Sequence, residues 1–131
     1  MKTDLVINEY VSRIRTGTLD VPQMMHILKD SGNHWMVAAV IIRTEKLDFA
    51  EKMEILKDSS DAYMVAVVII ETGTLDVPQM MHILKASGNH WMVAAVIIRT
   101  EKLDALQMTQ VLKDSGNDKY VAEAISKVLK K

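Results

Sequence analysis

The sequence predicts an all-α fold: a right-stacked array of antiparallel helix hairpins, preceded by an N-terminal capping helix. The first observation is internal repetition, because Thr16–Asp48 returns almost letter for letter as Thr72–Asp104. One of these 33 positions differs, with Asp30 replaced by Ala86. A diverged copy, Thr44–Glu71, lies between them, and the copies recur every 28 residues. A fixed period of this length is typical of a repeat array.

The repeats predict one domain over residues 1–131. Its expected parts are a capping helix at 1–15 and repeats at 16–43, 44–71, 72–99 and 100–131. The near identity of two blocks indicates recent duplication or engineering of the chain.

The first half of each repeat has the signals of a helix start. An Asp is followed three residues later by Gln or Glu, which is capping-box spacing. The four pairs are Asp20/Gln23, Asp48/Glu51, Asp76/Gln79 and Asp104/Gln107. Pro22 falls in the first turn, where its missing N–H costs nothing. Gly32 follows the first of these helices and suits a left-handed position after a helix end.

The second half of each repeat is ambiguous from its own letters. Met36–Ile42 is apolar on every side, so its periodicity fits a buried helix or a buried strand. A strand would give a β/α horseshoe of the leucine-rich-repeat kind. The chain ends favour the helix, because their polar replacements fall at helical spacing on one face. Those replacements are Asn8, Glu9, Ser12 and Arg13 near the start, and Glu123 and Ser126 near the end.

This plan of repeated helical hairpins resembles the α-solenoids, such as HEAT and armadillo arrays. The resemblance covers about the whole chain, but those families have longer repeats. None of their short sequence signatures is present, so the resemblance implies a stacked helical scaffold and assigns no functional residue.

Composition limits the classes of partner. The chain has 16 Lys and Arg against 17 Asp and Glu, which disfavours a nucleic-acid partner reached through net charge. Cysteine is absent, as in proteins of a reducing compartment. The longest apolar runs are far shorter than the roughly 20 residues of a membrane helix. We therefore expect a cytoplasmic protein that does not enter a membrane.

No group of residues has the spacing of an active site, so the sequence predicts that the chain is not an enzyme. The four histidines are His26, His34, His82 and His90. They lack metal-ligand spacing, and we interpret them as surface residues rather than as a metal site or a pH switch. Trp35 and Trp91 are interpreted as covers for the end of the core, with ligand stacking as the alternative. We expect no cofactor and no metal.

The leading functional hypothesis is a non-catalytic scaffold or protein–protein interaction module, with self-association as a further expected mode. Its expected surface is the exposed side of the first helix in two repeats. The candidate residues are Gln23, Met25, His26, Lys29, Gln79, Met81, His82 and Lys85. The alternative is a nucleic-acid-binding or regulatory module that uses basic residues of the inter-repeat turns. Those residues are Arg43, Lys46, Arg99 and Lys102.

Overall fold

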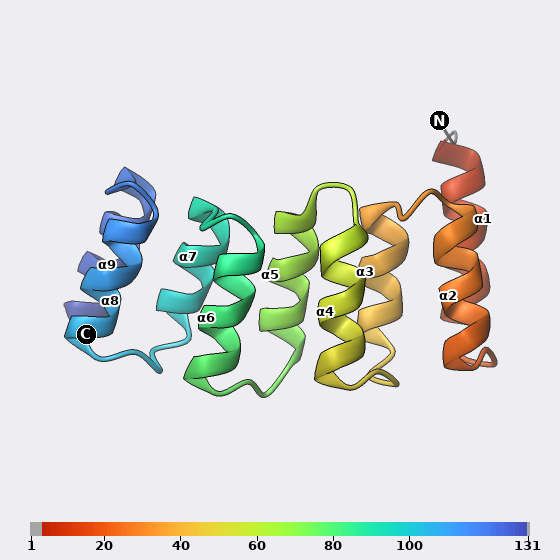
Figure 1. Ribbon diagram of the computed structural model, residues 1–131, viewed down its shortest axis with the longest axis horizontal. Helices are drawn as coiled ribbons and strands as arrows, with labels where there is room; N and C mark the ends of the chain where they lie inside the picture. Colours follow the sequence, from red (N-terminus) through yellow and green to blue (C-terminus); the bar gives the residue numbers. More distant parts are fainter. Residues whose placement is uncertain (1–3, 131) are drawn as a thin grey trace. The chain divides into compact units, whose positions relative to one another are not determined.

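The computed structural model describes residues 4–130. Residues 1–3, which belong to the expected capping helix, and residue 131 lie outside the described part. Between residues 4 and 130 the chain forms nine α-helices and no strand (Figure 1), which confirms the all-α prediction. The helices are α1 (Asp4–Arg15), α2 (Val21–Asp30), α3 (Trp35–Arg43), α4 (Phe49–Asp58), α5 (Ala62–Thr72), α6 (Val77–Ala86), α7 (Trp91–Arg99), α8 (Ala105–Asp114) and α9 (Lys119–Leu129). None of these helices is long and apolar enough to cross a bilayer.

The helices belong to two compact units, which are described separately. Unit 1 is Met1–Thr72 and contains α1 to α5. Unit 2 is Gly73–Lys131 and contains α6 to α9.

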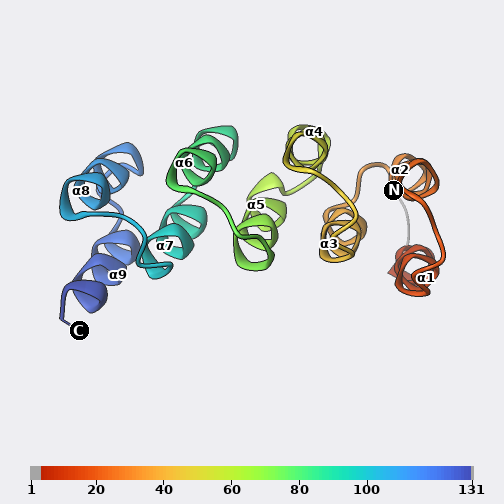
Figure 2. The same ribbon diagram turned by 90° about the horizontal axis from the view of Figure 1, so that it is seen from below.

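Within unit 1 the helices form two layers (Figure 2). One layer holds α1, α3 and α5, with α3 packed against both of the others. The second layer holds α2 and α4, which both pack onto α3. In unit 2, α7 packs against α9, and α6 packs onto α7. Helix α8 packs onto α7 and α9.

The apolar core of unit 1 is centred on α3. All six residues of its Val37–Ile42 stretch are buried, which explains why this segment is apolar on every side. The neighbouring α2 buries one stripe, Met24, Ile27 and Leu28, and leaves its opposite side exposed. Each fully buried side chain of this size stabilises the fold by about 1.5–3 kcal/mol. The exposed side of α2 is therefore positioned by the buried stripe beneath it.

Capping boxes begin α2, α4, α6 and α8, as the sequence predicts. At α2 the Gln23 amide donates to Asp20 Oδ1 at 2.8 Å, and the Asp20 amide donates back to Gln23 Oε1 at 2.8 Å. A cap of this kind contributes about 1 kcal/mol, because it satisfies amides that lack a partner inside the helix.

Three of these four helices end in the same way, and α4 ends differently. At the end of α2, Gly32 has a φ of +72°, and the Asn33 amide donates to the Leu28 carbonyl at 2.9 Å. The same pattern closes α6 and α8. Ser60 replaces the glycine after α4, and its amide donates instead to the Asn33 carbonyl at 3.1 Å. The loop after α4 is thereby joined to the loop after α2.

Candidate functional site

The exposed side of α2 faces α4 across a groove with a volume of about 470 Å³. We call it the α2–α4 groove. Its lining residues are Pro22, Met25, His26, Leu28, Lys29 and Asn33 with Glu54, Ile55 and Asp58. The capped start of α2 and its buried stripe fix the helix rotation, so that Met25 and Lys29 come to the groove one turn apart. The floor is apolar and both rims carry charged groups.

Three of the four predicted site residues on α2 meet in this groove: Met25, His26 and Lys29. Met25 is half-buried, whereas His26 and Lys29 are exposed. The fourth, Gln23, is held in the capping box by its side chain. It lines a smaller hollow beside Arg13 and Leu19, where His26 also contributes.

The four predicted residues on α6 of unit 2 have matching positions. Met81 is half-buried, and His82 and Lys85 are exposed. Gln79 closes the capping box of α6 with Asp76, with its amide and that carboxylate 2.8 Å apart. The two helices therefore present the same side chains at the same distances from their starts.

The α4 side of the groove, which includes an acidic rim formed by Glu54 and Asp58, was not predicted from the sequence. Glu54, Ile55 and Asp58 belong to the diverged copy of the repeat, whose first helix gave no candidate. The available signal was their alignment 28 residues after His26, Ile27 and Asp30, on the helix that follows in the same layer.

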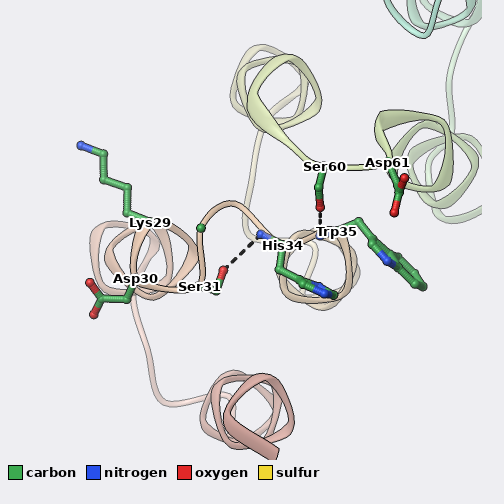
Figure 3. A pocket seen from close by; sticks show the side chains of 8 residues that line it. Lys29, Asp30, Ser31, His34, Trp35, Ser60 and Asp61 are labelled. Carbon is green, nitrogen blue, oxygen red and sulfur yellow. Dashed lines mark hydrogen bonds between the residues drawn. The ribbon is translucent and has the colours of Figure 1, made fainter. Parts of the chain in front are cut away.

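A second hollow adjoins Lys29 and reaches the start of α3 (Figure 3). Lys29 and Asp30 lie at one end, and Trp35 and Asp61 lie at the other. The Trp35 amide donates to Ser60 Oγ at 3.2 Å, so the loop after α4 forms part of the wall. Trp35 is half-buried, and the equivalent Trp91 of unit 2 is exposed.

Two histidines have a local role that the sequence did not suggest. His34 Nδ1 accepts from the Met36 amide at 3.2 Å, and His90 Nδ1 accepts from the Met92 amide at 3.1 Å. They are the N-caps of α3 and α7. Within residues 4–130, no three His, Asp or Glu side chains are grouped so that they could hold a metal ion.

The turn lysines also bind the protein's own backbone. Lys46 Nζ donates to the Leu19 carbonyl at 2.8 Å and to the Gly17 carbonyl at 3.0 Å. In unit 2, Lys102 Nζ donates to the Leu75 carbonyl at 2.8 Å. These bonds connect successive turns and give both ammonium groups a structural role.

The chain matches no protein-family model, no curated protein and no solved structure.

Proposed function

We propose that this chain is a non-catalytic helical-repeat protein that binds a partner protein through the α2–α4 groove. In this proposal each 28-residue repeat is one helix hairpin, and the hairpins stack in the general manner of an α-solenoid. The scaffold has no chemistry of its own and acts by presenting a surface.

The observation that carries the proposal is the groove itself. It brings Met25, His26 and Lys29 together with side chains from a second helix. Apolar floors with charged rims are common where a protein segment is recognised, because the floor contributes affinity and the rim selects the partner. Methionine also adapts its shape to different apolar side chains.

A peptide-display selection on the purified full-length chain tests this function. We expect selected peptides to bind wild type and to lose at least about tenfold in affinity for Met25→Glu, because this change puts a carboxylate on the apolar floor. Met81→Glu is the matched control, since Met81 is the same residue at the equivalent place on α6. Circular dichroism of both variants checks that the helices are retained.

Selected peptides that bind wild type and both variants with equal affinity would overturn the groove as the binding site. Equal losses for the two variants would assign binding to both units and contradict a site restricted to unit 1.

A further inference from the structure

The two rims of the α2–α4 groove differ in charge. Glu54 and Asp58 stand one turn apart on α4, and both are exposed. Carboxylates at this spacing on a helix repel each other. The ion pairs within residues 4–130 leave Glu54, Asp58 and Lys29 without a salt-bridge partner. The α4 rim is therefore an uncompensated acidic edge beside an apolar floor.

A third carboxylate, Asp30, lines the neighbouring hollow and lies beside the opposite rim. Asp30 lies 3.5 Å from His26 Nε2, with both groups on the exposed side of α2. Among residues 4–130, Lys29 is the one lysine that lines the groove. Carboxylates thus outnumber lysines around the groove, and its field favours a cation.

Unit 2 supplies an internal comparison. The floor residues of α2 return on α6 as Pro78, Met81 and Leu84, and Val111 of α8 stands where Ile55 stands in unit 1. Two of the three carboxylates, however, do not return. Gln110 takes the place of Glu54, and Ala86 takes the place of Asp30.

The carboxylate of unit 2 that is equivalent to Asp58 already has a partner. Gln110 Nε2 donates to Asp114 Oδ1 at 2.9 Å, which joins the residues equivalent to Glu54 and Asp58. The change of Asp30 to Ala86 is the one difference between the two 33-residue blocks. The two units therefore keep these apolar residues and differ in the carboxylates that accompany them.

We infer that the α2–α4 groove of unit 1 binds a basic segment of a partner protein, in which an apolar side chain is flanked by Arg or Lys. This inference rests on the proposed function and names the chemistry of the partner. The apolar side chain packs on Met25 and Ile55, while the cation lies against Glu54 and Asp58. Arginine suits this rim best, because its planar fork binds carboxylates with two parallel hydrogen bonds.

The test uses three fluorescein-labelled amphipathic peptides of about 14 residues, a length of four helical turns. Their leucines follow one face, and the other positions are all Arg, all Gln or all Glu. Fluorescence anisotropy on the full chain should show the Arg peptide binding most tightly and the Glu peptide most weakly. The affinity of the Arg peptide should fall as salt rises from low to moderate concentration, because exposed charges are screened.

Variants of the acidic rim locate the binding. Glu54→Gln should weaken the Arg peptide by about threefold, and Glu54→Lys with Asp58→Lys by about tenfold or more. Amide chemical shifts should change in residues 23–33 and 54–58 and stay unchanged on α6 and α8. The matched gain-of-function variant is Ala86→Asp with Gln110→Glu, which should raise the stoichiometry from about one peptide to about two, since each unit then holds one rim of this kind.

Each alternative outcome overturns a different statement. If the Gln or Glu peptide binds as tightly as the Arg peptide and Met25→Glu abolishes binding, the basic partner is wrong and the interaction surface stands. If the Arg peptide binds but Met25→Glu and the rim variants have no effect, both proposals fail at this groove. If the chain alone dimerises in sedimentation and Glu54→Lys abolishes the dimer, the occupant is a second copy and a separate basic partner is wrong.

Discussion

Helices α3 and α9 come from equivalent positions of the sequence repeat, 84 residues apart, yet they differ in what surrounds them. In unit 1, α3 packs against α1 and α5, and all of Val37–Ile42 is buried. In unit 2, α9 packs against α7 and α8 and buries two residues, Val121 and Ala124.

The sequence follows this difference residue by residue. Glu123 and Ser126 are exposed on α9, where α3 has the buried residues Ala39 and Ile42. The charged and polar side chains of α9 are exposed to water, and the apolar side chains of α3 are buried against neighbouring helices. The residue type at a repeat position therefore depends on the helices that surround it as well as on its place in the repeat.

The largest expected effect comes from placing one charge at equivalent positions of the two helices. Ala38 of α3 is 0% exposed, whereas the equivalent Ala122 of α9 is exposed. We expect Ala38→Glu to lower the free energy of unfolding of unit 1 by about 3–5 kcal/mol, because it buries an unpaired carboxylate. Ala122→Glu should change unfolding by less than about 0.5 kcal/mol.

Urea denaturation followed by circular dichroism measures the free energy of unfolding of the two variants. Small and equal losses at the two sites would contradict the difference in burial between α3 and α9.

Most of the features that the sequence predicted correctly depend on residues close together in the chain. The four capping boxes, the left-handed Gly32 and the polar face of α1 depend on residues within one helix or its flanks. Asn8, Glu9, Ser12 and Arg13 are all exposed, as predicted. Such features follow from residue spacing alone, so the sequence predicts them without knowledge of how the helices pack.

The features that were missed join distant parts of the chain. Ser60 stands where the other repeats have glycine, and this change is visible in the sequence. The residues around Ser60 do not predict that its hydroxyl accepts from the Trp35 amide, 25 residues earlier. The bonds of Lys46 to the Gly17 and Leu19 carbonyls have the same non-local origin. The acidic rim of the groove was missed for this reason too, since it exists only when α4 lies beside α2.

A smaller effect on the free energy of unfolding is expected at the N-termini of α3 and α9, which begin differently. Each helix has its own N-cap, His34 for α3 and Asp118 for α9. The first amide of α3, that of Trp35, donates in addition to Ser60 of a distant loop. We expect Ser60→Ala to lower the free energy of unfolding by about 0.5–1 kcal/mol, because the Trp35 amide loses its acceptor. Hydrogen exchange of that amide should become faster.

Ser59→Ala is the control, because the Ser59 hydroxyl donates to the Ile55 carbonyl of its own helix at 2.7 Å. It should leave the exchange of the Trp35 amide unchanged. Equal exchange rates in wild type and Ser60→Ala would show that the link between the two loops does not protect α3.

The smallest expected effect on stability is also the sharpest test of the open face of α9. Glu123→Ala with Ser126→Ile gives α9 the residues that α3 has at these positions. The unfolding free energy should change by less than about 0.5 kcal/mol, because the pair of Glu123 with Lys127 is exposed and the new groups gain no neighbour within the chain. The enlarged apolar surface should instead cause self-association, seen as concentration-dependent sedimentation. Glu123→Gln with Ser126→Thr keeps the face polar and should sediment as wild type does. If the apolar variant also sediments as wild type does over the whole concentration range, the polar residues of α9 do not serve to keep this face free of other chains.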